Sequence, residues 1–567
     1  MFIHTSPVPG RIDMSATQQG SMSAVRRLPV SLMSLYAMTT LVLVTGCPAT
    51  PPPPKPPTPA GGAVNGGSTK PTTTANEKAP AKGADAHEAP PEPLLADWKS
   101  PAAVLLLTGL QHGYLEPCGC SIHQLGGMAR RADLVRMLTE ERKWAVSGLD
   151  VGGAPKRNRR QDQIKYLALF DAFKKLNYGA VAVGREELLL GADFLLQQMV
   201  SDPEEAKKTV ALLGANVALY DPPLEGWPLA SRIVQVGEIK VGVTAIVGVS
   251  LRKDVAPDGA MNNITIRDPD EVLPAAIAAL KAEQPQFLVL LSHGSTEEAS
   301  ALAAKYPEFQ IVLTAGGPDE ADKKPVVVGK TWVIQAEPKG KRVGVLGYFP
   351  DNAEQPFRYD LVALDDQRFK DHPTMRELMK TYQQQLLDEA ISTSEELLIK
   401  HPSGHTFVGA DKCGECHTKA FAHWKESPHA KAFEPLISGR KGDVDPISRI
   451  YDPECLACHV TGWDAKQMLR YDSGYISQER TPHLLNQQCE NCHGPGSHHV
   501  SLQERFANDA ASVTTAELEA GRTSVRQTLE TAKKGACASC HDSDNDPRFT
   551  PDAFDKYWAK IAHPWRD

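Results

Sequence analysis

Short apolar runs alternate with amphipathic stretches between residues 99 and 362. The apolar runs have the length and composition of buried strands. The predicted strands are 104–107, 180–183, 211–213, 241–243, 287–291 and 311–313. Apolar residues at helical spacing predict helices over 125–142 and 163–177. This alternation predicts an α/β domain of stacked layers over 99–362, with any site on the loops at strand ends.

The pattern changes on both sides of this domain. Apolar residues at helical spacing between 375 and 390 predict a packed connecting helix within residues 363–400. Residues 401–567 contain only weak apolar runs. We therefore expect bound groups to supply much of the core of this last region.

The N-terminal region is typical of an exported protein. Arg26 and Arg27 precede the mostly apolar residues 28–45, and small residues then lead to Cys47. This layout predicts a secretory signal over residues 1–47. It resembles a bacterial lipobox, in which Cys47 would carry lipid and tether the protein to a membrane surface. An uncleaved spanning helix is the alternative.

Residues 48–98 are rich in proline, glycine, threonine and alanine, so they predict a disordered linker that spaces the folded part from the lipid. An exported lipoprotein of this kind lies at the periplasmic or cell-envelope face of a membrane. The 567 residues carry 61 basic and 69 acidic side chains, a net charge of −8. Because there is no basic excess, we expect no nucleic-acid partner.

Cysteine and histidine are concentrated in residues 401–567. This region contains four Cys-x-x-Cys-His motifs. Their cysteines are Cys413, Cys416, Cys455, Cys458, Cys489, Cys492, Cys537 and Cys540. Two thiols at this spacing attach to the two vinyl groups of one haem, and the next histidine reaches the iron. Zinc ligands and disulfides are the alternatives, but neither requires a histidine after every second cysteine. The sequence therefore predicts four covalently bound c-type haems.

Each predicted haem needs iron ligands. The proximal ligands are predicted to be His417, His459, His493 and His541. The candidates for the distal position are His401, His405, His423, His429, His483, His498, His499 and His563, and we favour His429, His499, His563 and His405. A haem with two histidines can only transfer electrons, whereas a haem with one is open to small molecules.

Three segments carry a family resemblance. They are the W-x-x-S-x-H segment ending at His429, the C-x-x-C-H-V-T-G run ending at Gly462, and the C-E-N-C-H-G-P-G-S-x-H run ending at His499. Residues 404–567 resemble the tetrahaem cytochromes c that carry electrons from hydroxylamine oxidation. The resemblance implies a mostly helical, haem-packed fold and an electron-transfer role. It also allows for one five-coordinate haem.

Residues 99–362 resemble a different family. Seven segments occur in the order found in the calcineurin-like metallophosphoesterase domain of UshA-like 5′-nucleotidases. The segments are 107–113, 149–153, 182–187, 213–217, 291–293, 315–318 and 334–336. The resemblance implies a layered metallophosphoesterase-like sandwich.

The metal ligands of that family are mostly replaced. Leu110 and Gly153 stand where aspartates would stand, and Arg185 and Glu186 replace an asparagine and a histidine. Only His112 and His293 keep their places. Two histidines without a bridging carboxylate cannot hold a two-metal centre. We therefore expect neither a divalent metal nor phosphoester hydrolysis. A single metal held by these histidines and a glutamate stays an alternative.

Cys118 and Cys120 flank a glycine in the first loop of this domain. The sequence resembles a branch of the UshA-like group with this C-G-C insertion. The two thiols would form a redox pair, with metal binding and an inert disulfide as alternatives.

Three functions follow. The first is a membrane-tethered electron carrier that exchanges electrons with a redox protein and uses the α/β domain for binding or docking. The second is a redox enzyme that uses Cys118 and Cys120 or an open haem. The third is a metal-dependent nucleotide hydrolase.

Overall fold

The computed structural model describes residues 93–117, 124–199, 202–257, 263–439 and 445–563. All of them belong to one compact unit, Ala86–Asp567. The predicted signal, Cys47, most of the predicted linker, Cys118 and Cys120 lie outside the described residues. No helix within the described ranges is long and apolar enough to cross a membrane.

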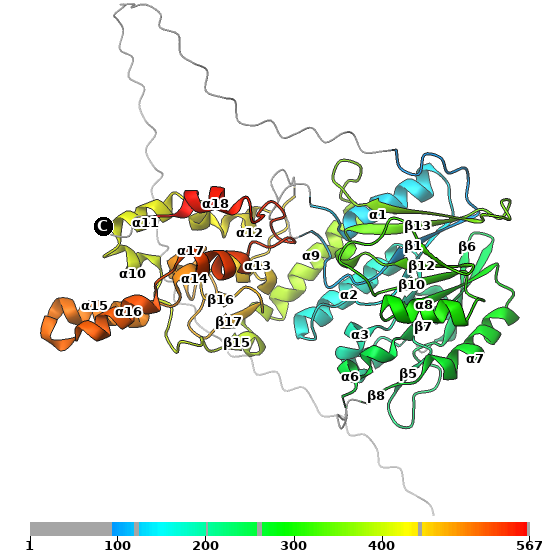
Figure 1. The fold of residues 1–567 in the computed structure, drawn as a ribbon, viewed down its shortest axis with the longest axis horizontal. Coiled ribbons are helices and arrows are strands. Elements are labelled where there is room, and N and C mark those ends of the chain that lie inside the picture. Colours follow the sequence, from blue (N-terminus) through cyan, green and yellow to red (C-terminus); the bar gives the residue numbers. More distant parts are fainter. Residues whose placement is uncertain (1–92, 118–123, 200–201, 258–262, 440–444, 564–567) are drawn as a thin grey trace, which may run out of the picture. The chain divides into compact units, whose positions relative to one another are not determined.

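Two six-stranded sheets form the centre of the α/β region (Figure 1). The first has the order β14-β13-β1-β2-β3-β4, and the second has the order β11-β12-β10-β9-β7-β6. The strands of the first sheet are β1 (Ala103–Thr108), β2 (Val146–Asp150), β3 (Tyr178–Ala182), β4 (Ala211–Leu213), β13 (Arg342–Tyr348) and β14 (Phe357–Ala363). Those of the second are β6 (Ser231–Val236), β7 (Ile239–Val247), β9 (Phe287–His293), β10 (Ile311–Thr314), β11 (Val326–Val328) and β12 (Thr331–Gln335). A small pair, β5 (Val217–Leu219) and β8 (Ile264–Ile266), lies beside them.

The two sheets pack face to face. β9 shows how: Val289 and Leu291 join the apolar cluster between the sheets, whereas Leu288 and Leu290 join the cluster under the outer helices. Because successive side chains of a strand point to opposite faces, a strand buried on both faces reads as a continuous apolar run. This is why the periodicity of the sequence revealed the central strands.

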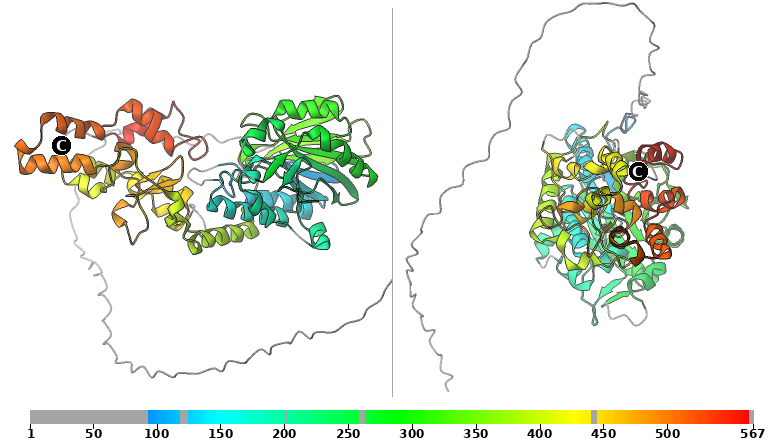
Figure 2. Two further views of the ribbon diagram at one scale, coloured as in Figure 1. Left: turned by 90° about the horizontal axis from the view of Figure 1, so that it is seen from below. Right: turned by 90° about the vertical axis from the view of Figure 1, so that its left-hand side faces the viewer.

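Helices cover both outer faces of this sandwich (Figure 2). They are α1 (Met128–Arg136), α2 (Arg160–Lys175), α3 (Arg185–Leu189), α4 (Ala192–Leu196), α5 (Pro203–Lys208), α6 (Arg252–Val255), α7 (Pro269–Ala282) and α8 (Thr296–Lys305). Helices α7 and α8 contribute Leu273, Ile277 and Ala299 to the cluster on one face. The predicted layered α/β fold is confirmed.

The ends of two helices differ from the prediction. The helix expected from residue 125 begins at Met128, because Gly126 and Gly127 have φ of 104° and 101°, outside the helical region. Its last turn is a π-helix, Met137–Glu141. The second helix begins at Arg160 rather than at residue 163, and the Asp162 side chain accepts from the backbone N–H of its N-cap.

Helix α9 (Pro373–Asp388) links the sandwich to a C-terminal region of short helices. Those that follow are α10 (Ala410–Gly414), α11 (Thr418–Lys425), α12 (Glu434–Ser438), α13 (Pro453–His459), α14 (Cys489–His493), α15 (Ser497–Asn508), α16 (Thr515–Ser524), α17 (Leu529–Thr531) and α18 (Phe554–Ile561). A small sheet of β15 (Leu398–Ile399), β17 (Leu469–Tyr471) and β16 (Trp463–Asp464) lies among them. The C-terminal region is mostly helical, as expected.

Candidate functional site

Each Cys-x-x-Cys-His motif occupies a helical turn. The second motif ends α13, the third forms α14, and the fourth begins on the 3₁₀ turn Cys537–Ser539. The amide of His417 bonds to the carbonyl of Cys413 at 2.9 Å, and His541 bonds to Cys537 in the same way. Residues three and four apart share one face of a helix, so both thiols and the histidine of each motif are directed to the same side.

Three of the four motif histidines face a histidine from a distant part of the chain. The ring centroids of His417 and His499 are 6.3 Å apart. Those of His541 and His429 are 6.2 Å apart. The rings of His493 and His563 are separated by 5.9 Å.

These separations fit a metal between the two rings of each pair. A nitrogen ligand lies about 2 Å from its metal and the imidazole centre about 1 Å beyond it, so the centres of two opposed ligands lie about 6 Å apart. Three of the favoured distal candidates therefore occupy positions that suit an axial ligand of a haem. His405 lies elsewhere, because its ring stacks on that of His498 at 4.7 Å.

His459 has different surroundings. Its Nδ1 contacts the carbonyl of Ala432, which leaves Nε2 for a metal. Within the described residues, no second imidazole is stacked across from its ring. His423 contacts the carbonyl of Lys560, and His401 contacts Ser403. The second motif therefore differs from the other three in having no facing imidazole among the described residues.

The motifs also contact one another through their cysteines. The thiols of Cys413 and Cys489 lie close to each other, and so do those of Cys458 and Cys540. Cys492 lies near Cys537 and Cys540. These contacts give the spatial order first, third, fourth, second motif.

Polar residues that sequence reasoning missed hold the motifs in this arrangement. The buried carboxylate of Glu490, inside the third motif, accepts from the amides of Val408, Gly409 and Gly496. Asn491, its neighbour, accepts from Thr461 at 2.8 Å, just after the second motif. In the sequence, Glu490 and Asn491 are marked only by their place between the two cysteines of the third motif, and that place does not reveal a distant partner.

The α/β region places its two retained histidines close to Glu186. His293 Nε2 lies 3.1 Å from Glu186 Oε2, and its Nδ1 lies 2.8 Å from the carbonyl of Val151. Burial would raise the pKa of Glu186, but His293 lowers it to about 2. Burial likewise acts to lower the pKa of His293, yet the contacts with Glu186 raise it. The structure therefore holds a buried Glu186–His293 pair in which each side chain favours the charged form of the other.

The contact between Glu186 and His293 occupies a carboxylate oxygen and an imidazole nitrogen that a metal ion would need as ligands. The second glutamate of the loop, Glu187, accepts from the amides of Gly153, Ala154 and Gly184. Burial lowers the pKa of His112, and nearby Lys339 adds to that effect. Among the described residues, no cluster of three or more histidine, cysteine, aspartate or glutamate side chains could hold a metal ion.

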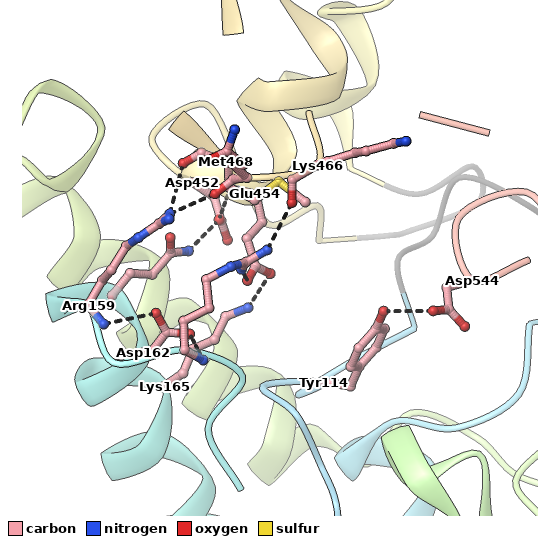
Figure 3. A network of polar contacts seen from close by, with 12 residues as sticks. Tyr114, Arg159, Asp162, Lys165, Asp452, Glu454, Lys466, Met468 and Asp544 are labelled. Carbon is pink, nitrogen blue, oxygen red and sulfur yellow. Dashed lines mark hydrogen bonds and ion pairs between the residues drawn. The ribbon is translucent and has the colours of Figure 1, made fainter. Parts of the chain in front are cut away.

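The α/β region contacts the second motif through a buried polar network (Figure 3). Asp452, just before that motif, accepts from Gln161 of α2 and Gln383 of α9, each at 2.8 Å. Glu454 forms ion pairs with Lys165 and with Arg157. Lys165 lowers the pKa of Glu454 against the opposing effect of burial.

A second contact involves the loop after the fourth motif. Asp544 pairs with Lys339 at 2.5 Å and Lys341 at 3.0 Å, and Tyr114 donates to the same carboxylate (Figure 3). Arg449 pairs with Glu116 at 2.5 Å. These contacts join the α/β region to the two motifs that share the Cys458–Cys540 contact.

Comparison with known proteins agrees with the motifs and the helical geometry. The model of the cytochrome c554 and c-prime family matches residues 412–494. Cytochrome c-554 of Nitrosomonas europaea is 31% identical over 179 residues, and the match covers 27% of this chain and 70% of that protein. The protein is thus a multihaem c-type cytochrome with an α/β region. The chain belongs to the cytochrome c554 family, and the predicted resemblance of its C-terminal part is confirmed.

Several solved structures are similar to this one. The 5′-nucleotidase precursor of Thermus thermophilus is 23% identical, with a TM-score of 0.41, over 50% of this chain and 59% of that one. The sulfate thiohydrolase SoxB of the same organism is 16% identical, with a TM-score of 0.41, over 51% of this chain and 62% of the other. This chain therefore spans less than two thirds of either structure.

Proposed function

We propose that this protein is an exported, membrane-tethered cytochrome that carries electrons on four covalently attached haems. In this proposal the α/β domain binds a ligand or docks on a partner, and it does not hydrolyse phosphoesters. The three imidazole pairs carry the proposal, since each joins a motif histidine to a histidine from another helix or loop at the spacing of two axial ligands. Bound haem would supply reversible uptake and release of single electrons.

The chain's own residues set how such a carrier works. At the first, third and fourth motifs the paired histidines would hold the haem iron from both sides and would thereby exclude small molecules from it. Among the described cysteines, Cys416 of the first motif is the exposed one. Since this motif stands at one end of the spatial order, its surface is where we expect a redox partner to exchange electrons.

Counting haems and reducing them tests this proposal. The purified protein should contain four covalently bound haems per chain, and all four should be reversibly reduced. Fewer attached haems would overturn the tetrahaem assignment, and irreversible reduction would overturn the carrier role. Replacing Cys47 with serine should release the protein from membranes, and an unchanged membrane fraction would contradict the lipid tether.

A redox enzyme is the second candidate, favoured by the environment of His459. The distal side of the second motif would then accept a small molecule. Carbon monoxide added to the fully reduced protein should shift part of the haem spectrum, close to one haem in four. If the spectrum does not shift, no haem is open to small molecules. The protein is then an electron carrier, and any catalysis is left to Cys118 and Cys120.

The pairing of Glu186 with His293 supports the non-hydrolytic role. Because the Glu186 carboxylate is already paired with His293, it is not free to bind a metal. Metal analysis should find iron alone, and nucleotides should release no phosphate. Two bound divalent metals with phosphate release would restore the hydrolase.

A further inference from the structure

The loop after the fourth motif carries a carboxylate that faces the motif histidine. Asp546 Oδ2 lies 3.0 Å from His541 Nδ1. The ring of Phe549 stacks on the His541 ring with centroids 4.7 Å apart, and His429 faces that ring at 6.2 Å. The orientation of His541 is therefore held on several sides, with Nδ1 on the carboxylate and Nε2 left for a metal.

Other motif histidines have a different partner at this atom. His493 Nδ1 contacts the carbonyl of Val525 at 2.7 Å, and His459 Nδ1 contacts that of Ala432. A carboxylate carries a full negative charge and draws the Nδ1 proton more strongly than a carbonyl does, so it makes the imidazole a stronger electron donor. A stronger donor favours the oxidised form of a bound iron.

The α/β domain holds the same loop in place. Two residues before Asp546, the Asp544 carboxylate is paired with Lys339 and Lys341, and its carbonyl accepts from Gln124 at 2.7 Å. The amide of Lys339 is bonded to the carbonyl of Leu110 at 2.7 Å, in the first loop of the sandwich. The loop that carries Asp546 is thus held by a clamp that the α/β domain provides, together with a local bond from the Asp546 amide to the Asp542 carbonyl at 2.8 Å.

We propose that Asp546 is a positioning residue that lowers the reduction potential at the fourth motif, and that the Lys339–Lys341 clamp keeps it on His541. This inference rests on the proposed haem attachment and assigns the α/β domain a part in setting the redox properties of the cytochrome.

Equilibrium redox titration of the full-length, haem-loaded protein tests Asp546. In Asp546→Asn, the ferrous:ferric ratio of one haem at a fixed ambient potential should rise about tenfold, equivalent to 59 mV for one electron. Asp546→Glu should restore most of the difference. Asp552→Asn, a nearby exposed carboxylate, is the matched control and should leave every transition unchanged. Four attached haems with unaltered transitions in Asp546→Asn would overturn the role of Asp546, whereas missing haems would instead overturn the proposed function.

The direction of a second change in reduction potential tests the Lys339–Lys341 clamp. In Lys339→Met/Lys341→Met, release of the loop should raise the potential of the same haem, as in Asp546→Asn. Loss of two positive charges from a loop that stays in place would lower that potential. A fall, or no change, therefore overturns the clamp. Lys323→Met/Lys324→Met removes two exposed lysines of the same domain and is the matched control. Circular dichroism and the haem count verify that each variant is folded and loaded.

Discussion

Replacing Lys165 with methionine tests whether the contact between the α/β region and the second motif stabilises the protein. Lys165 lies on α2, its ammonium pairs with Glu454, and its side chain is 7% exposed. Methionine keeps most of the apolar stem and removes only the charge. The variant leaves the Glu454 carboxylate without its nearest cation.

The size of the effect follows from burial. Removing one partner of a buried ion pair costs about 3–5 kcal/mol, whereas an exposed pair contributes about 0.2–1 kcal/mol. Glu454 is 24% exposed and keeps Arg157 at 3.5 Å. Because water and Arg157 compensate part of the charge, we expect the free energy of unfolding to fall by about 2 kcal/mol.

Urea unfolding followed by circular dichroism and haem absorbance measures this loss. Lys175→Met is the matched control on the same helix, since its ion pair with Asp171 has side chains 42% and 51% exposed. That control should lose no more than about 0.5 kcal/mol. A double-mutant cycle with Glu454→Gln should give a coupling of about 1–2 kcal/mol. Equal losses in the two lysine variants, or a coupling near zero, would refute the reasoning.

Three further predictions concern single sites. In His563→Ala, the removal of one axial ligand should raise the carbon monoxide-binding fraction by about one haem in four, and an unchanged fraction would show that His563 is not a ligand. In Cys537→Ser, attachment at the fourth motif should weaken and the melting temperature should fall, because bound haem supplies much of this core; an unaltered melting curve would contradict that role. In Glu186→Gln, stability at pH 7 should fall by about 1–3 kcal/mol, since His293 loses its buried partner. The lowered pKa of Glu186 stabilises the native protein above the ordinary pKa of glutamate, and this contribution is lost as pH falls toward about 2. The raised pKa of His293 stabilises it below the ordinary pKa of histidine, a contribution lost as pH rises through the folded value. Unfolding measured against pH should therefore be flatter in the variant, and identical pH profiles would count against the pair.

Central strands such as β1 and β9 could be predicted because they are buried on both faces and read as uninterrupted apolar runs. The edge strands β6, β11 and β14 were not predicted, because exposed positions interrupt their apolar pattern. Helix ends were harder to place. Gly126 and Gly127 adopt positive φ because the loop before α1 requires it, and an apolar pattern does not carry that information. The connecting helix was predicted within 363–400. It begins at Pro373, where the His372 side chain accepts from the amide of Thr374, and it packs against α2.

The sequence by itself determined the chemistry of the attachment motifs. Two thiols and a histidine within five residues share one side of a helical turn, so their spacing alone predicts haem attachment. Only the tertiary structure decided which distant histidines face three of the four motifs, that Glu186 pairs with His293, and that Asp546 reaches His541 on a loop held by the α/β domain. These contacts join residues that are far apart in the sequence and share no repeating pattern. They depend on where whole helices, strands and loops lie in the fold, and on the need to pair buried polar groups.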